Sequence, residues 1–240
     1  MCASTVSSKM LGAIARAEGF RFDDTLTGFK YISSHSEYLR SEAGGNHLVL
    51  FGYEEAIGYC CGDIVNDKDG ISALGVFAEL CVWVYSQKRM NMVQYLQSLC
   101  DIYGEFVTNN GYYYCHDPTV VFQIMAKLRN GGKYLSKVGL YTIQSIRDLG
   151  AYPYDSTTLD HKPTLPTSKT SPMITLTFTN GCITQIRASG TEPKLKYYIE
   201  LPGKPGVSKK MVQEELDIMS DVLLEELLEP TKHGLVKVKP

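Results

Sequence analysis

The sequence predicts two domains: an α/β three-layer domain over residues 1–106, truncated at its N-terminus, and a small α+β domain with an antiparallel sheet and packing helices over residues 107–240. In the first part, short apolar strands alternate with helical patterns, which is typical of α/β layering. In the second part, strands of alternating polarity follow one another and lead into an amphipathic helix. The change of pattern near residue 106 marks the expected boundary.

The first domain begins directly on a helical pattern. Leu11, Ile14 and Ala15 share one face of this helix, and Gly19 is a typical stop signal. No complete strand precedes the helix in the sequence, so we expect the domain to lack its opening strand. The further elements expected in this domain are a strand at 49–51, a turn at 69–70, and helices over 74–85 and 93–103.

The clearest β pattern in the second domain lies near residue 180. Ile174, Leu176 and Phe178 alternate with threonines, and Asn180-Gly181 is a strong hairpin signal. Ser208 is placed to cap a last amphipathic helix that ends before Pro230. The other expected elements are a turn at 109–111, a strand at 112–115, a helix from 116–118 to 130–132, a surface loop at 150–172, and strands at 183–186 and 195–201.

The composition is that of an ordinary soluble globular protein, with 44% hydrophobic and 21% charged residues. The formal net charge of −2 provides no basic field for nucleic acid or an anionic membrane, so neither is an expected partner. No apolar run approaches transmembrane length, and the densest one, residues 74–85, contains Glu79 and is expected to be a buried helix. The five histidines have no metal-ligand spacing, so no metal site is expected.

Seven cysteines show no disulfide framework, and no signal peptide is visible. We interpret them as reduced apolar residues of a cytoplasmic protein. Cys60 and Cys61 are adjacent, whereas the usual redox motif has two intervening residues, so a redox role is disfavoured.

One polar loop between two of these strands could hold a phosphate group. Arg187 offers a planar fork of donors, Ser189 and Thr191 add hydroxyls, and Gly190 lets backbone N–H groups approach an anion. Lys196 adds a second positive charge on the polar face of the next strand. An ordinary polar turn is an equally good explanation of this composition.

The segment Arg-Ala-Ser-Gly-Thr-Glu-Pro at 187–193 closely resembles the phosphate-binding loop in the last domain of the α-D-phosphohexomutases. Three further segments resemble that family in the family's order: 27–30 its Thr-Gly loop, 53–58 its sugar-binding loop, and 67–70 its Lys-Asp-Gly segment. Four ordered matches are more specific than any single one. The chain is thus similar to the third and fourth domains of these enzymes.

Details of these segments resemble the phosphopentomutase/phosphoglucomutase-2 branch. The strings Thr-Leu-Thr-Gly-Phe-Lys at 25–30 and Leu-Pro-Thr-Ser-Lys at 165–169 agree with that branch. Ala56 stands where many hexose-specific members have serine. The loss of that hydroxyl fits a site that accepts pentose phosphates.

The resemblance implies a role for each matching residue in the first domain. Glu54 would accept hydrogen bonds from sugar hydroxyls, beside Thr27 and Gly28. Glu55 is less expected to point inward, because neighbours on an extended chain face opposite ways. Lys68 would bring positive charge to the reacting phosphoryl group or assist proton transfer. Taken alone, Glu54 is better explained as an exposed strand-end carboxylate, and a solvated turn lysine is a serious alternative for Lys68.

In the second domain, the resemblance implies that the loop holds the phosphate that is not transferred. Arg187, Ser189, Gly190 and Thr191 would grip it, with Lys196 beside them, and so position the sugar for reaction. The implied activity is that of an intramolecular phosphotransferase, a phosphoglucomutase or phosphopentomutase that interconverts a sugar 1-phosphate with a 5- or 6-phosphate through a bisphosphate.

The family's phosphoserine loop, Thr-x-Ser-His-Asn-Pro, and its Mg²⁺ loop, Asp-x-Asp-x-Asp-Arg, have no counterpart in the sequence. Ser34-His35 is followed by Ser36-Glu37, so we expect a loop or helix start there. The chain is therefore expected to be an inactive fragment, truncated isoform or incomplete gene model, whose Mg²⁺, sugar bisphosphate activator and N-terminal domains lie elsewhere. The alternatives are a non-catalytic phosphosugar-binding module, a glucose-1,6-bisphosphate synthase-like enzyme, and a loop that binds no ligand.

Overall fold

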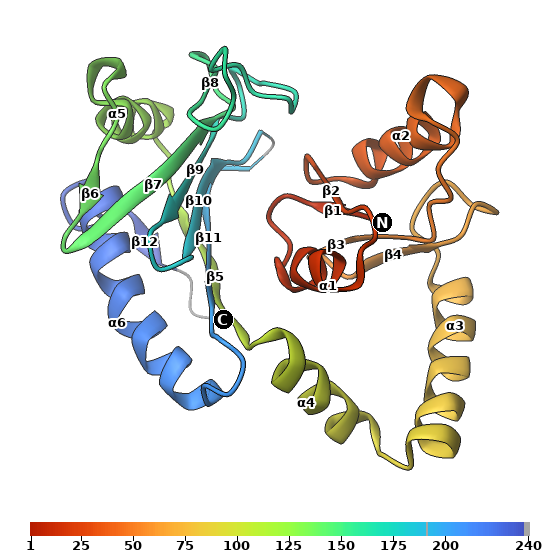
Figure 1. The fold of residues 1–240 in the computed structure, drawn as a ribbon. Helices are drawn as coiled ribbons and strands as arrows, with labels where there is room; N and C mark the ends of the chain where they lie inside the picture. Colours follow the sequence, from red (N-terminus) through yellow and green to blue (C-terminus); the bar gives the residue numbers. More distant parts are fainter. Residues whose placement is uncertain (191, 238–240) are drawn as a thin grey trace. The chain divides into compact units, whose positions relative to one another are not determined.

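The computed structural model describes residues 1–190 and 192–237 (Figure 1). The chain divides into two compact units, Met1–Phe106 with Lys204–Gly206, and Val107–Gly203 with Val207–Pro240. The first unit is an α/β domain and the second combines an antiparallel sheet with packed helices, as the sequence predicted.

The first unit is built on a four-stranded sheet of order β2-β1-β3-β4. Its strands are β1 (Cys2–Ser4), β2 (Asp23–Thr25), β3 (Phe51–Glu54) and β4 (Gly58–Cys61). β1 runs parallel to β2 and β3, and β4 runs antiparallel to β3. A strand therefore does precede the first helix, contrary to the prediction, because three residues are too few to show a sequence period.

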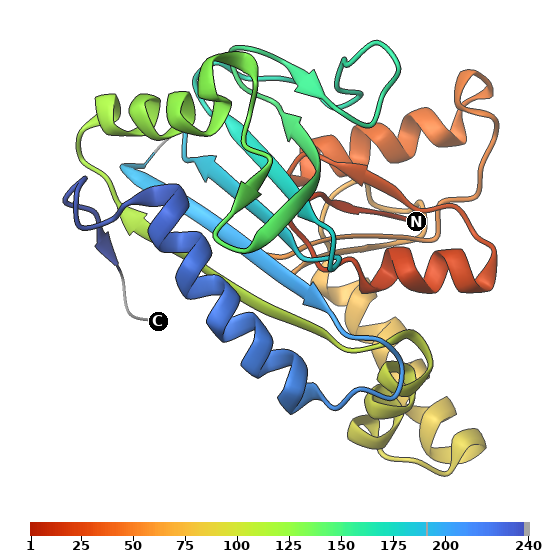
Figure 2. The same ribbon diagram turned by 60° about the vertical axis from the view of Figure 1, so that its left-hand side comes forward.

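Two helices cover opposite faces of this sheet, as Figures 1 and 2 show: α1 (Met10–Glu18) and α2 (Phe29–Arg40). Gly19 ends α1 in a left-handed conformation, as its stop signal predicted. Phe29, Ile32 and Leu39 of α2 are buried against the sheet. A 3₁₀ turn, η1 (Glu42–Gly44), follows α2.

The next two helices are α3 (Gly70–Trp83), which continues through the π-helical turn η2 (Val84–Lys88), and α4 (Met92–Tyr103). The prediction of a buried helix over 74–85 is wrong, because Val84 is the one buried residue of Gly70–Lys88. The expectation that no apolar run approaches membrane-spanning length is also wrong. Gly70–Lys88 form a helix of 19 residues, because η2 continues α3, and an 18-residue window of this helix has a mean hydropathy of 1.2. The core helix of a soluble protein can be equally long and apolar, so length and composition alone do not identify a membrane span.

The second unit contains an eight-stranded sheet, in the order β12-β5-β11-β10-β9-β7-β6 with β8 paired to β7. Its strands are β5 (Phe106–Tyr114), β6 (Lys137–Val138), β7 (Tyr141–Asp148), β8 (Tyr154–Asp155), β9 (Met173–Phe178), β10 (Ile183–Ala188), β11 (Lys194–Pro202) and β12 (Val236–Lys237). Its helices are α5 (Pro118–Arg129), η3 (Asn130–Gly132) and α6 (Lys209–Leu228).

The strong local sequence signals in this unit predicted its structure correctly. The strands on both sides of Asn180-Gly181 pair as an antiparallel hairpin. The Ser208 hydroxyl accepts a hydrogen bond from the Met211 N–H and caps α6. Val212, Leu216 and Leu223 of this helix are almost fully buried, as the amphipathic pattern predicted.

One predicted turn in the second unit is wrong, and several strands of this unit were missed. The turn expected at 109–111 lies inside strand β5. The Asn110 side chain there accepts a hydrogen bond from the Ile199 N–H, and a Cβ on Gly111 would lie 2.5 Å from the Tyr197 hydroxyl oxygen. Asn and Gly are thus required by the neighbouring strand rather than by a turn. Strands β6, β7, β8 and β12 were not predicted, and β8 lies inside the surface loop that was expected at 150–172.

Candidate functional site

The predicted sugar-binding segment forms the hairpin between β3 and β4. Glu54 pairs directly with Gly58, so the loop consists of the three residues 55–57. Ile57 has a φ of 62°, which is strained for a β-branched residue, and its side chain is 79% exposed. A Cβ on Gly58 would lie 2.8 Å from the buried Phe29 ring, so glycine is needed where the hairpin packs on α2.

The two adjacent carboxylates of this loop lie in different surroundings. Glu54 is buried, and its Oε1 lies 3.8 Å from Nζ of Lys68, which also sits 5.6 Å from the centre of the Phe29 ring. Glu55 is half-buried and accepts a 2.7 Å hydrogen bond from the Ser4 hydroxyl. The Thr27 hydroxyl is 3.3 and 3.4 Å from the two oxygens of the same carboxylate.

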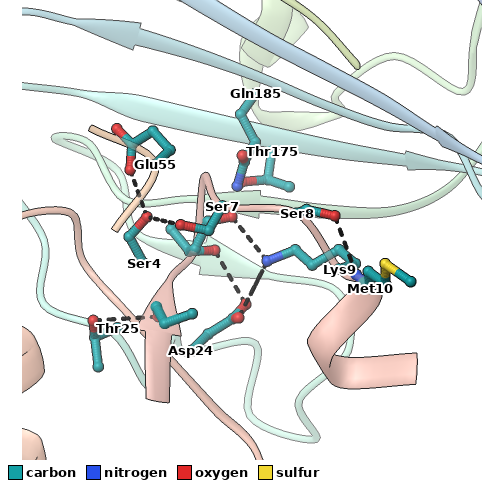
Figure 3. A network of polar contacts seen from close by, with 12 residues as sticks. Ser4, Ser7, Ser8, Lys9, Met10, Asp24, Thr25, Glu55, Thr175 and Gln185 are labelled. Atoms are coloured by element: carbon teal, nitrogen blue, oxygen red, sulfur yellow. Dashed lines mark hydrogen bonds and ion pairs between the residues drawn. The ribbon is translucent and has the colours of Figure 1, made fainter. Parts of the chain in front are cut away.

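Glu55 belongs to a polar network at the carboxyl ends of the parallel strands (Figure 3). The Ser7 and Ser4 hydroxyls are 2.7 Å apart, and the Lys9 ammonium forms a 3.1 Å ion pair with Asp24 and donates to the Thr5 carbonyl. The chain leaves β1 toward β2 on one side and returns to β3 on the other. In open α/β sheets, ligands bind outside the carboxyl ends of the strands at such a switch point.

The predicted phosphate-binding residues are arranged around the end of the β10–β11 hairpin. Arg187 and Lys196 are direct cross-strand partners. Like charges in this position repel each other and destabilise the pair unless an anion lies between them. Neither side chain has an acidic partner within ion-pair distance in the part of the chain that the structure describes.

The loop beyond this pair is closed by its own hydrogen bonds. The Ser189 N–H donates to the Lys194 carbonyl, and the Ser189 hydroxyl accepts from the Glu192 N–H. Lys194 is held by Glu192 at 2.8 Å and lies over the Tyr112 ring, so its charge is already compensated. Gly190 is exposed, with Ser171 3.7 Å from the position of a Cβ. Thr191, also predicted for this site, lies outside the described residues.

The predicted site residues thus form one group in each unit. Thr27, Glu54, Glu55 and Lys68 come together in the first unit, with Gly28 at the N-terminus of α2. Arg187, Ser189, Gly190 and Lys196 come together in the second. Sequence reasoning missed Ser4, Ser7 and Lys9 around Glu55. The polar run Ser-Thr-Val-Ser-Ser-Lys at 4–9 was a visible signal, but only if the short strand before it had been recognised.

The structure also explains other residues that could have been a nucleophile, a redox pair or metal ligands. Ser34 and His35 lie within α2 rather than in a loop or at a helix start, and the His35 ring is 2.7 Å from Asp23. Burial raises the pKa of the Cys60 and Cys61 thiols, which makes both poor nucleophiles. Within residues 1–190 and 192–237, no three His, Cys, Asp or Glu side chains are grouped closely enough to hold a metal ion.

Comparison with known proteins shows which protein family contains these two groups of residues. Residues 1–103 match the family model of the phosphoglucomutase/phosphomannomutase α/β/α domain III. The chain is 42% identical over 240 residues to mouse glucose 1,6-bisphosphate synthase and 43% identical over 239 residues to human phosphopentomutase. Each alignment covers 98% of this chain. The chain belongs to the phosphohexomutase superfamily. The predicted family is therefore confirmed, and the chain spans 38% of the length of each of these relatives.

The fold of this superfamily member also has solved counterparts. The open form of the phosphoglucomutase parafusin from Paramecium superposes with a TM-score of 0.66 over 97% of this chain and 38% of that chain. Its sequence identity is 19%, so the likeness concerns the fold alone. It supports the predicted order of an α/β domain followed by an α+β domain.

Proposed function

We propose that this chain supplies the sugar- and phosphate-binding part of a phosphoglucomutase or phosphopentomutase. Such an enzyme interconverts a sugar 1-phosphate with a 5- or 6-phosphate through a bisphosphate. The observation that carries the proposal is the cross-strand pair of Arg187 and Lys196, two cations side by side with hydroxyl and backbone donors beyond them. A phosphate dianion between them would turn their repulsion into attraction and accept the bidentate fork of the arginine.

The contribution of the chain to catalysis is binding and orientation. The Arg187 group would hold the phosphate that does not react, and the Glu54–Glu55 hairpin would accept hydrogen bonds from sugar hydroxyls. Binding that restricts the freedom of a substrate lowers the entropic part of the barrier. Lys68 lies beside Glu54, where its ammonium could offset negative charge on a phosphoryl group.

The phosphoryl donor and Mg²⁺ would be held by other parts of the enzyme. The described residues do not fit Mg²⁺, because no group of three acidic or histidine side chains is present among them. We therefore assign to additional domains a phosphoserine that donates and recovers the phosphoryl group, a Mg²⁺ site, and reaction with a sugar bisphosphate activator.

Seven free cysteines fit our proposal of a cytoplasmic enzyme.

A second candidate is a glucose-1,6-bisphosphate synthase, which the similarity to the mouse relative of that name favours. It would use the same phosphate and sugar contacts with a different phosphoryl donor. Only a comparison of donors in a turnover assay separates it from a mutase.

Removal of the guanidinium tests the phosphate site. Arg187→Ala should weaken binding of ribose 5-phosphate by about 10- to 100-fold, because a hydrogen bond to a charged group contributes about 1.5–3 kcal/mol. Titration calorimetry on the 240-residue chain measures the change, and circular dichroism checks that the fold persists. The control is Lys210→Ala, which removes an exposed cation paired with Glu214 at 3.8 Å. Equal affinity in Arg187→Ala and Lys210→Ala would refute the assignment.

A turnover assay tests the division of labour. With Mg²⁺ and a sugar bisphosphate present, the purified chain should bind ribose 1-phosphate and glucose 1-phosphate but convert neither. Measurable conversion would mean that a phosphoryl acceptor lies within these residues, and the proposed division would be wrong.

A further inference from the structure

Residues 168–171, which lie just before β9, form a turn that is fixed to the sheet. The Ser168 N–H donates to the Leu149 carbonyl at 2.8 Å, and the Ser168 hydroxyl accepts a hydrogen bond from the Ser171 N–H at 3.1 Å. Leu149 directly follows β7 and is buried, and its own N–H donates to the Met173 carbonyl at 2.8 Å. The turn is therefore held between the end of β7 and the start of β9.

This turn lies against residues 188–190 of the proposed phosphate loop. The Ala188 N–H donates to the Pro172 carbonyl at 3.0 Å, and the Ser171 hydroxyl donates to the Ala188 carbonyl at 2.7 Å. The Ser171 Cβ is 3.7 Å from the position of a Cβ on Gly190. Because β10 lies between β9 and β11 in the sheet, the turn lines one side of the loop and β11 lies on the other.

The turn carries a lysine whose charge is not compensated. Lys169 is exposed and has no acidic partner within ion-pair distance among the residues that the structure describes. It precedes Ser171 by two residues, so the two Cα atoms are at most about 7 Å apart. Together with Arg187 and Lys196, it makes three positive charges from three segments around one loop. Such a group favours a dianion.

We propose that Lys169 binds the phosphate group of the sugar phosphate as a third cation of the site. The proposal rests on the proposed function and extends the phosphate site from the segment 187–196 to the turn 168–171. A phosphate monoester has three acceptor oxygens, and the fork of Arg187 takes two of them. A lysine ammonium is a flexible point charge with three donors, which suits the oxygen that remains.

A charge series at Lys169 tests the proposal by titration calorimetry on the 240-residue chain. Lys169→Ala should weaken ribose 5-phosphate and inorganic phosphate alike, by about three- to tenfold, because the contact is to the group that they share. Lys169→Arg should retain most of the affinity, and Lys169→Glu should lose more than Lys169→Ala. The matched control is Lys162→Ala, an exposed lysine of the same loop that is paired with Asp160 at 3.6 Å. It should leave both affinities unchanged.

Ionic strength separates a charge contact from an effect on the shape of the turn. Attraction between exposed charges is screened by salt, so the loss caused by Lys169→Ala should be smaller at about 0.5 M than at about 0.05 M sodium chloride. A loss that arises from a distorted turn would be the same at both concentrations. A flat charge series, a salt-independent loss, or a loss confined to ribose 5-phosphate overturns the role of Lys169.

This proposal and the proposed phosphate site fail in different ways. A wild-type chain that binds neither ligand, or Arg187→Ala that binds both as tightly as the wild type, would refute the phosphate site and the role of Lys169 together. A clear loss in Arg187→Ala, with Lys169→Ala and Lys169→Glu as tight as Lys162→Ala, would refute the role of Lys169 alone.

Discussion

Two hairpins of this chain have the same length but different chemistry at the same position. The β3–β4 hairpin has the three loop residues 55–57, and the β9–β10 hairpin has 179–181, closed by a hydrogen bond from the Phe178 N–H to the Cys182 carbonyl. In both, the third loop residue has positive φ, at 62° for Ile57 and 87° for Gly181. A glycine is the usual residue there in a three-residue hairpin.

The β9–β10 hairpin follows the local rule throughout. Gly181 adopts positive φ without a steric penalty, and the Asn180 side chain accepts a hydrogen bond from the Cys182 N–H. The β3–β4 hairpin breaks the rule with an isoleucine, at a cost of about 1–2 kcal/mol for a residue with a Cβ. Almost no burial offsets this cost, because the Ile57 side chain is 79% exposed.

The difference separates a hairpin that serves the fold from one that we propose to form part of a binding site. Local strain persists where surrounding structure imposes it, and it gathers at functional positions. Here the surrounding structure is specific: Gly58 is packed on Phe29, and Glu55 is held by Ser4. The loop is thus fixed on both sides of Ile57.

Among the variants that test the difference between the two hairpins, Gly58→Ala should have the largest effect on stability and binding. The new Cβ would meet the Phe29 ring at 2.8 Å and Glu54 at 3.1 Å, so unfolding free energy should fall by about 1–3 kcal/mol and sugar affinity should fall with it. Urea denaturation and ribose 5-phosphate titration measure the two changes. Gly181→Ala is the matched control in the other hairpin.

That control should destabilise by about 1–2 kcal/mol, through its positive φ and the contact of the new Cβ with Pro202 at 3.0 Å, and leave ribose 5-phosphate binding intact. If both glycine variants changed stability and binding alike, the distinction between the two hairpins would be lost.

The sequence was informative where structure depends on nearby residues. The Asn180-Gly181 hairpin and the Ser208-capped helix α6 could be predicted because turn, cap and apolar face lie within a few residues of one another. Strand β1 could not, because three residues show no period and its place comes from pairing with β2 and β3. The same holds for Asn110 and Gly111, whose role depends on β11.

The candidate site divides in the same way. The residues of the proposed phosphate loop are contiguous, so a hypothesis about their donor groups could be made from the string at 187–190. The support of Glu55 could not, because Ser4, Thr27 and Glu55 come from three segments that meet only at the sheet edge. The exposed apolar face of α3 also contradicts sequence reasoning, because hydropathy alone does not tell whether a partner covers a helix.

A smaller effect is expected from relief of the strain itself. Asparagine tolerates the left-handed conformation, so Ile57→Asn should raise the unfolding free energy by about 0.5–1 kcal/mol. If the strain maintains the binding geometry of the loop, ribose 5-phosphate affinity should fall a few-fold at the same time, because a relaxed loop samples other positions of Glu55. Thermal unfolding and calorimetry on one sample give both values. A gain in stability with undiminished affinity would show that the isoleucine is a tolerated defect, and the β3–β4 hairpin would then differ from the β9–β10 hairpin in strain but not in function.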